Sequence, residues 1–298
     1  MPSVIHYTNC PACGSTEIGY VFTAKDNTVS GEQFEIWECR FCTLRFTQDT
    51  PDQLSIGSYY KSENYISHSN TSKGFINSLY QLVRKQTLHQ KRKIINKITG
   101  LKKGNILDLG SGTGSFVNEM HLHGWDATGL EPDGDARKIA EENYHIKLQN
   151  TDQFYNLPPA SFDAITLWHV LEHVHDLHPY LEQLKKLLKN NGKLVVAVPN
   201  YTSSDAKKYR QYWAAYDVPR HLYHFSPLSM KKLMNSHQLS IIHFKPMLLD
   251  SFYISLLSSK YKNGRTNWVT AGWSGLWSDI KTLRNKKKSS SVIYIISK

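Results

Sequence analysis

Short apolar runs alternate with segments of helical periodicity over the last two thirds of the chain. The runs are rich in aliphatic residues and are bounded by polar or glycine-containing turns, which is typical of short buried strands. We predict strands at 105–109, 126–130, 145–149, 162–168 and 193–198. The segment 179–190 places leucines on one face and lysines on the other, and Asn190-Asn191-Gly192 is expected to end that helix. This alternation predicts an α/β domain with a parallel sheet covered on both faces.

Further patterns extend this prediction in both directions along the chain. Residues 75–98 carry apolar side chains in helical register and are expected to form one long helix. Ser226 and Pro227 form a typical helix start, with the serine as N-cap and the proline in the first turn. Residues 240–246 and 291–297 are predicted to form two late strands.

The strand predicted at 105–109 runs directly into three alternate glycines, Gly110, Gly112 and Gly114, and then into a helical pattern. Glycine lets the backbone approach a ligand closely and adopt a positive φ where a turn requires it. The N–H groups at the start of the following helix point to the same place. The turn therefore indicates a nucleoside-binding site, and a purely structural tight turn is the alternative.

An acidic residue ends the next predicted strand, about twenty residues after the glycine turn, at a spacing that suits a ribose-binding carboxylate. This residue, Glu131, can accept hydrogen bonds from both hydroxyls of the sugar. The alternative is a solvated charge near the start of the next helix. Ser115 stands where a nicotinamide fingerprint carries its third glycine, so the pattern here is Gly-x-Gly-x-Gly.

Three segments together resemble the motifs of class I S-adenosylmethionine-dependent methyltransferases. They are Leu-Asp-Leu-Gly-Ser-Gly-Thr-Gly at 107–114, Gly-Leu-Glu-Pro at 129–132, and 161–173, which ends in Trp-His-Val-Leu-Glu-His. The resemblance covers roughly residues 90–298 and implies a Rossmann-like seven-stranded α/β sheet, with the two late strands as an edge hairpin. It also implies S-adenosylmethionine as the cofactor. The implied cofactor-binding residues are Asp108, Gly110, Gly112, Gly114, Glu131, Pro132, Asp152 and His169.

All four cysteines lie in the first 50 residues, as the pairs Cys10/Cys13 and Cys39/Cys42. Two Cys-x-x-Cys pairs at this separation can offer four thiolates to one tetrahedral zinc ion. Two disulfides or a redox pair are the alternatives, but disulfides need an oxidising compartment and the N-terminus lacks the apolar segment of a signal peptide. The sequence therefore predicts a zinc ribbon whose closed site is structural.

These observations predict three parts: a zinc ribbon at 1–50, a helical connector or cap at 51–100 that includes a tyrosine-rich stretch, and a cofactor-binding domain at 101–298. No run reaches the ~18 apolar residues that a membrane-spanning helix needs. Reduced cysteines and the supply of the cofactor favour a cytoplasmic location.

The segment 201–224 is much longer than the ~2–6 residues of an ordinary connection in an α/β unit, and a long loop at this edge is typical of a functional site. Its aromatic residues can exclude water, and its arginine and histidines can hold an anion or move a proton. Pro-Arg-His at 219–221 and His-Phe-Ser at 224–226 resemble a signature of methyltransferases with an N-terminal zinc-binding ribbon, some of which act on sugars. The candidate catalytic residues are His221 as the first choice of base, then His224, with Arg220, Tyr216 and His173.

Histidines are also spaced four apart at His169 and His173, with His175 and His178 nearby. An i, i+4 pair can share a metal ion on one helix face. This interpretation is not favoured, because ordinary members of the resembled family carry Val-Leu-Glu-His here without a metal.

The chain is basic, with 36 Lys and Arg against 25 Asp and Glu, and nine of these basic residues with a single acid lie in the last 48 positions. Such a segment is more often a solvated loop than a binding site. The favoured partner is a small-molecule acceptor, sugar-linked and lipid-linked compounds included, methylated on oxygen or carbon. A zinc-ribbon enzyme acting on RNA or tRNA, and a non-catalytic binding module, are the alternatives. The sequence does not set the oligomeric state.

Overall fold

The computed structural model describes residues 3–60, 75–264 and 288–298, and the chain forms two compact units. One unit combines Met1–Tyr65, His169–Tyr180 and Ala197–Tyr294, and the other combines Ile66–Trp168, Leu181–Val196 and Ile295–Lys298. Each unit is thus built from segments distant in sequence, and the linear division at residues 50 and 100 stays a prediction. Most of the tyrosine-rich connector, and residues 265–287 of the basic segment, lie outside the described residues.

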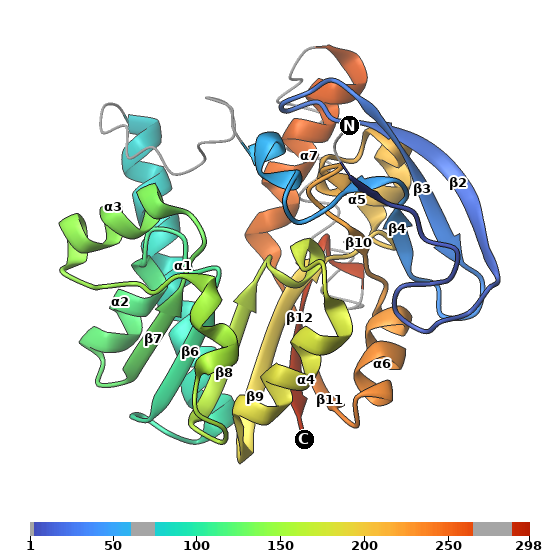
Figure 1. The fold of residues 1–298 in the computed structure, drawn as a ribbon. Coiled ribbons are helices and arrows are strands. Elements are labelled where there is room, and N and C mark those ends of the chain that lie inside the picture. Colours follow the sequence, from blue (N-terminus) through green and yellow to red (C-terminus); the bar gives the residue numbers. More distant parts are fainter. Residues whose placement is uncertain (1–2, 61–74, 265–287) are drawn as a thin grey trace. The chain divides into compact units, whose positions relative to one another are not determined.

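The larger sheet contains the predicted parallel strands. Its strand order is β11-β12-β9-β8-β6-β7, and β6 pairs in parallel with both β7 and β8 (Figure 1). The strands are β6 (Asn105–Leu109), β7 (Asp126–Leu130), β8 (Phe162–Trp168), β9 (Leu188–Pro199), β11 (Ser240–Pro246) and β12 (Ser291–Ser297). The two late strands lie side by side at one edge, as predicted, and residues of β6, β8 and β9 are almost completely buried.

The strand predicted at 145–149 is reduced to one bridge, so among the described residues the sheet has six strands where seven were expected. Gln149 donates to the Gly129 carbonyl at 3.0 Å and accepts from the Glu131 N–H at 2.9 Å, which makes a parallel bridge with Leu130. His145 has a φ of 57° and ends the preceding helix in the left-handed conformation. Only Gln149, the last residue of the predicted strand, therefore pairs with the edge of the sheet.

The helix predicted at 179–190 is shifted toward the N-terminus. It spans Leu177–Leu187 as α4, and residues 188–192 already belong to β9. A Cβ on Gly192 would lie 2.8 Å from Leu188 Cγ and 2.9 Å from the Phe162 carbonyl oxygen. Gly192 is thus required by close packing rather than by a helix end, and its role in the prediction was wrong.

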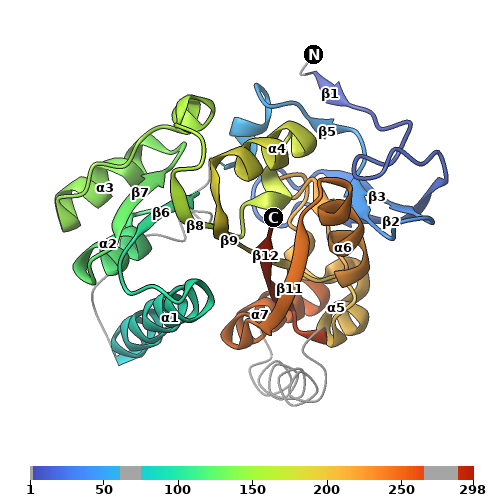
Figure 2. The same cartoon turned by 90° about the horizontal axis from the view of Figure 1, so that it is seen from below.

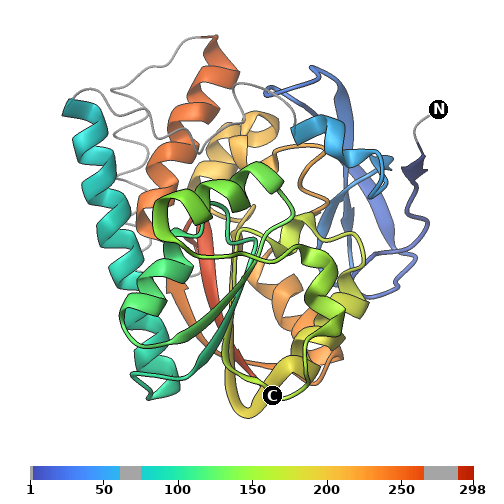
Figure 3. The same cartoon turned by 60° about the vertical axis from the view of Figure 1, so that its left-hand side comes forward.

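The unit that contains β6, β7 and β8 also holds the first three α-helices. Figure 2 shows α1 (Phe75–Thr99), α2 (Ser115–Leu122) and α3 (Gly134–Tyr144) grouped around β6 and β7. α1 is the long helix predicted at 75–98, and it is the teal helix in Figure 3. A short 3-10 helix, η2 (Thr151–Asn156), precedes β8. Arg92 of α1 and Glu119 of α2 form an ion pair at 2.7 Å that joins the two helices.

The other unit contains a four-stranded sheet of order β10-β4-β3-β2. Three of its strands come from the N-terminal segment: β2 (Ile18–Lys25), β3 (Gln33–Cys39) and β4 (Arg45–Thr47). The fourth is β10 (Tyr223–His224), which pairs antiparallel with β4 through Tyr223 opposite Phe46 and His224 opposite Arg45. A two-stranded sheet joins β1 (Val4–Ile5) to β5 (Thr50–Pro51), and η1 (Ile56–Tyr60) follows. The predicted ribbon segment therefore shares its sheet with the end of the predicted active-site loop.

The same unit also contains several helices. They are η3 (Leu171–His173), α5 (Ser204–Tyr209), η4 (Arg210–Tyr212), η5 (Ala214–Tyr216), α6 (Pro227–Ser236) and α7 (Leu248–Asn263). α6 begins as predicted, with Ser226 as N-cap in a capping box with Ser229. One apolar core joins both parts of the unit, since Phe34 and Ile36 of β3 pack in a cluster with Trp213 and Tyr216. Among the described residues, no helix has the length and apolar character needed to cross a membrane.

Candidate active site and cysteine cluster

The glycine turn has the backbone conformation that its sequence indicated. Gly110, Gly112 and Gly114 have φ values of 64°, 53° and 74°, in the left-handed region that favours glycine. Gly114 also occupies the N-cap position of α2, and a Cβ there would lie 2.8 Å from the Cβ of Ala140. The first N–H groups of α2 lack a side-chain cap from this position. Gly110 is exposed and Gly112 is half-buried at the carboxyl end of β6, where α/β sheets bind ligands, whereas Gly114 is buried against α3.

The carboxylate of Glu131 is hydrogen-bonded to the glycine turn. Its Oε2 accepts from the Gly112 N–H at 2.7 Å, and its Oε1 accepts from the Asp133 N–H at 3.0 Å. Burial raises the pKa of Glu131, although these two N–H groups oppose the shift. Each carboxylate oxygen keeps further acceptor capacity, so the group can still receive hydroxyl donors.

Asp108 lies just before the glycines in the chain and is buried. Its Oδ1 accepts from the Thr166 hydroxyl of β8 at 2.6 Å, and burial raises the pKa of Asp108 to about 6. The positive charge of Lys91 opposes that rise. Lys91 comes from α1, and its Nζ lies 4.2 Å from the ring centre of Trp168. Neither Lys91 nor Trp168 was among the site residues predicted from the sequence. The position of Lys91 in the helix before the first parallel strand could have indicated a charge near the glycine turn.

The three remaining residues that the resemblance implied for the cofactor are Pro132, Asp152 and His169. Pro132 is exposed beside Glu131, and its carbonyl accepts from Arg137 at 2.7 Å. Asp152 lies exposed in the first turn of η2. His169 belongs to the other unit, has a φ of 59°, and lies with Nδ1 3.2 Å from the Glu172 carboxylate. Their roles toward a cofactor stay predictions.

The four cysteine sulfurs converge as predicted. All lie within 4.8 Å of one another, with Cys10 and Cys42 at 3.5 Å and Cys13 and Cys39 at 3.6 Å. Four sulfurs bound at ~2.3 Å around a tetrahedral ion would be about 3.8 Å apart, so this spacing fits zinc. Burial is the main cause that raises the pKa of Cys13 to about 11, and Cys42 and Cys39 add to the shift whereas Cys10 and the Ser15 backbone oppose it. A cation among the four sulfurs would favour their deprotonated forms.

The two cysteine loops have the same backbone geometry. Gly14 donates to the Cys10 carbonyl at 2.9 Å, and Thr43 donates to the Cys39 carbonyl at 2.8 Å. Both donors have positive φ, 71° for Gly14 and 61° for Thr43. Thr43 is held there by a hydrogen bond between its hydroxyl and that of Ser226, and by one from the Tyr201 hydroxyl to its carbonyl. Thr43 thus takes the conformation that glycine takes in the first loop.

Arg220 is buried in an ion-pair network within its unit. Its guanidinium contacts Asp217 at 2.7 Å and Asp26 at 3.0 Å, and it donates to the Tyr59 carbonyl at 2.8 Å. Tyr216 is also buried, and its hydroxyl accepts from Arg45 at 3.0 Å. Both candidates therefore connect the predicted active-site loop to the N-terminal segment through internal contacts.

His224 and His221 differ in their surroundings. His224 is a strand residue of β10 whose Nε2 lies 3.2 Å from the Thr47 hydroxyl, and burial holds its pKa well below the usual range. His221 has Nδ1 2.9 Å from the Ala215 carbonyl. A carbonyl only accepts, so Nδ1 carries the hydrogen and Nε2 of the neutral ring keeps its lone pair.

His173 packs edge to face against His221, with ring centres 4.6 Å apart. Its Nδ1 lies 3.0 Å from the Arg220 carbonyl and 2.9 Å from the Tyr60 hydroxyl. Burial is the main cause that lowers the pKa of His173 to about 4, and the nearby His221 adds to the shift. His173 is thus neutral over the physiological range, and the structure brings it together with His221 as the sequence suggested.

Comparison with known proteins bears on the glycine turn and its surroundings. The family model described as a methyltransferase domain matches residues 83–244, more than half of the chain. The chain belongs to this methyltransferase family. The matched region includes the glycine turn, Glu131 and the loop 201–224.

Individual relatives agree with this assignment and leave the acceptor undefined. An uncharacterised methyltransferase from Alkaliphilus oremlandii is 29% identical over 119 residues, which are 39% of this chain and 55% of that protein. One from Bacillus anthracis is also 29% identical, over 38% of this chain and 55% of that protein. The chain thus spans about half the length of the curated relatives it matches.

A solved structure shows the same fold. Geranyl diphosphate C-methyltransferase from Streptomyces coelicolor A3(2) superimposes with a TM-score of 0.51 at 13% identity, over 79% of this chain and 89% of that one. That structure contains Mg²⁺, geranyl diphosphate and S-adenosyl-L-homocysteine. At this identity the likeness concerns the methyltransferase fold alone.

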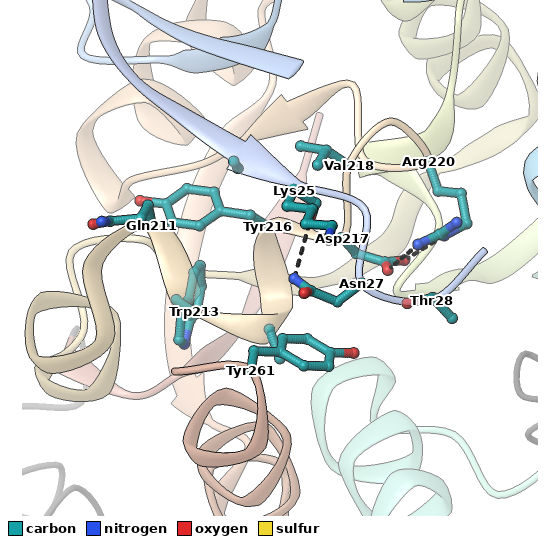
Figure 4. A pocket seen from close by; sticks show the side chains of 12 residues that line it. Lys25, Asn27, Thr28, Gln211, Trp213, Tyr216, Asp217, Val218, Arg220 and Tyr261 are labelled. Atoms are coloured by element: carbon teal, nitrogen blue, oxygen red, sulfur yellow. Dashed lines mark hydrogen bonds and ion pairs between the residues drawn. The ribbon is translucent and has the colours of Figure 1, made fainter. Parts of the chain in front are cut away.

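One pocket of this family member is lined by the predicted active-site loop. It lies between the end of β2, the segment 211–220 and Tyr261 of α7 (Figure 4). Trp213, Tyr216 and Tyr261 supply aromatic groups, and Asn27 and Gln211 supply amides. Its cavity volume is about 10 Å³, room for about one water molecule and far below the ~300–1,000 Å³ of pockets that hold drug-sized ligands.

Proposed function

We propose that the protein is an S-adenosylmethionine-dependent methyltransferase that acts on a hydroxyl or acidic carbon of a small acceptor, free or linked to a sugar or lipid. The observation that carries this proposal is the glycine turn, with three positive φ values and the Glu131 carboxylate bonded to it, inside the region that matches the methyltransferase family.

The cofactor would lie against the carboxyl ends of β6 and β7. Glu131 would accept hydrogen bonds from the two ribose hydroxyls, and the backbone of Gly110 and Gly112 would adjoin the methionine end, while Gly114 allows α2 to pack closely against α3. The buried Asp108 would lie beside the methionine end of the cofactor. Lys91 would supply the positive charge that a methionine carboxylate needs. These residues bind and orient the methyl donor, which is already activated as a sulfonium.

The acceptor side of the proposal rests on the loop 201–224. The acceptor oxygen or carbon attacks the methyl group in line, the carbon–sulfur bond breaks with its electrons remaining on sulfur, and the acceptor loses a proton. The Nε2 lone pair of His221 makes this residue the first choice to receive that proton, ahead of His224, whose low pKa and strand position leave it a structural role.

The same four cysteines are proposed to hold one structural zinc ion. Their closed Cys₄ arrangement leaves no position for a substrate, so the ion would stabilise the N-terminal part of the sheet rather than take part in the transfer.

Calorimetric titration with S-adenosylmethionine, followed by a transfer screen over nucleotide sugars, lipid precursors and tRNA, tests this function. We expect cofactor binding and methylation of one acceptor class. His221→Ala should bind the cofactor normally and lower turnover roughly 10²-fold or more, because proton transfer contributes about that much. The exposed His243 supplies the matched control, and His243→Ala should retain turnover. Absence of cofactor binding would favour a non-catalytic module, and unchanged turnover in His221→Ala would remove that residue from the mechanism.

A further inference from the structure

A second group of metal-ligating side chains lies in the same unit as the cysteine cluster. Glu172, His173 and His221 each offer one ligand atom, and these atoms lie within 4.8 Å of one another. Glu172 and His173 come from η3, whereas His221 comes from the loop 201–224, so the chain fold brings them together. We propose that these three residues form a site for a divalent transition-metal cation, separate from the cysteine cluster.

The hydrogen bonds of the two histidines orient them for this role. His221 donates from Nδ1 to the Ala215 carbonyl at 2.9 Å, and His173 has Nδ1 at 3.0 Å from the Arg220 carbonyl. Both carbonyls can only accept, and the Tyr60 hydroxyl, 2.9 Å from Nδ1 of His173, can accept as well, so a hydrogen on Nδ1 satisfies these contacts and leaves a lone pair on Nε2 of each neutral ring. Histidines that bind metals usually donate their other N–H in this way, and the bond fixes both tautomer and ring orientation.

Glu172 completes the donor set. Its side chain is fully buried, and among the described residues no hydrogen bond reaches Oε2. Its Oε1 lies 3.2 Å from Nδ1 of His169. A buried carboxylate oxygen that receives no hydrogen bond favours a cation beside it.

The spacing and the donor types select the kind of ion. Bonds of ~2.0–2.2 Å to nitrogen and oxygen hold ligand atoms roughly 3–4 Å apart, so atoms that lie within 4.8 Å of one another need to approach by at most about 1–2 Å. Two imidazoles and one carboxylate suit zinc, iron, cobalt, nickel or manganese better than calcium or magnesium, which prefer oxygen ligands. Three protein ligands also leave a coordination position open, as in catalytic metal sites.

The role of the ion rests on the proposed function, whereas its binding does not. An acceptor hydroxyl at the open position would have a lower pKa and would release its proton to solvent, leaving an electron pair on oxygen to form the new bond to the methyl carbon. In that case His221 would act through the cation that it holds. Without an ion, its Nε2 would face Asp217, whose Oδ2 lies 4.0 Å away.

Cobalt binding to the full-length, zinc-loaded protein tests this site. Co²⁺ held by nitrogen and oxygen gives weak visible bands, unlike the intense charge-transfer bands of cobalt bound by thiolates. We expect one Co²⁺ per chain with the zinc retained. Glu172→Gln and His173→Gln should weaken cobalt binding by roughly 100-fold or more, since loss of an outer-sphere partner alone costs ~10–100-fold. The control His243→Ala should bind cobalt like the original chain.

The outcomes separate this inference from the proposed function. A single metal ion per chain, confined to the cysteines, would overturn the site, as would equal cobalt affinity in Glu172→Gln and the original chain. Retained zinc and an unchanged circular dichroism spectrum would show that each variant is folded. Cobalt binding without transfer to any acceptor would support the site and count against the proposed function. Methyl transfer by a chain that binds no second metal would support the proposed function and overturn the metal site.

Discussion

Replacement of Asp26 by asparagine tests the buried ion pair that joins the N-terminal segment to the active-site loop. The Asp26 side chain has no solvent exposure and lies 3.0 Å from the equally buried Arg220 guanidinium. It also accepts from the N–H groups of Thr28, Val29 and Ser30 at 2.8–3.1 Å. Asparagine keeps the size of the side chain, removes its charge and replaces one acceptor by a donor.

The expected loss of folding stability follows from the pKa of the Asp26 carboxyl. Burial alone would raise the pKa of Asp26, but hydrogen bonds from Arg220 and the backbone outweigh it and lower the pKa from 3.8 to about 2. The folded-state pKa is lower than the unfolded one, so the charge stabilises the fold above pH ~4, and this contribution is lost as the pH falls toward 2. A shift of this size corresponds to ~2 kcal/mol. Arg220 keeps Asp217 as a partner in the variant, so we expect a loss somewhat below the ~3–5 kcal/mol of a fully broken buried pair.

Thermal unfolding of Asp26→Asn, followed by intrinsic fluorescence at several pH values, measures this contribution. At pH 7 the midpoint should fall by roughly 5–10 °C, since 1 kcal/mol corresponds to ~2–4 °C in a chain of this size. The difference from the original chain should shrink between pH 4 and 2. Asp49→Asn is the control, because Asp49 pairs with His6 at an exposed position. A midpoint within 1 °C of the original at pH 7, or a difference that does not change with pH, would refute the reasoning.

Two further substitutions test packing and metal binding. Gly129→Ala should destabilise the fold by ~1–3 kcal/mol, because a Cβ there would lie 2.5 Å from Leu148 Cδ2, whereas Gly57→Ala, in open space, should have little effect; equal unfolding midpoints would contradict this. Cys39→Ser should lower the zinc content of the purified protein from one ion per chain and destabilise the N-terminal part of the sheet, as measured by metal analysis and limited proteolysis. Full zinc occupancy in the variant would exclude the four-cysteine site.

Features that depend on neighbouring residues were predictable from the sequence. The positive φ values at Gly110, Gly112 and Gly114 follow from a strand that runs into alternate glycines, and the helix start at Ser226 follows from its capping pattern. The convergence of the cysteines was also predictable, because two short Cys-x-x-Cys turns tend to share one ion. The assignment to a methyltransferase family needed only these local motifs in their order.

Features that depend on long-range contacts were not predictable. Asp26 and Arg220 are 194 positions apart, and nothing near either residue indicates the other. Gln149 ends the segment 145–149, which resembles a strand in sequence. The helix α3 ends at His145 in the left-handed conformation, so only Gln149 forms a bridge to the sheet. The grouping of Glu172 with His221 likewise depends on the fold of the loop, which the spacing of histidines along the chain does not contain.

The strand β10 makes the order of synthesis relevant to folding. Residues 223–224 pair with β4, and residues 45–47 lie about 180 positions earlier in the chain. The N-terminal sheet therefore cannot acquire its last strand until most of the chain has left the ribosome. Zinc bound early by the cysteines would hold β3 and β4 in place during that interval, because Cys39 ends β3 and Cys42 lies in the turn that leads to β4. We expect zinc depletion to lower the yield of folded protein during synthesis more than it lowers the stability of protein that has already folded.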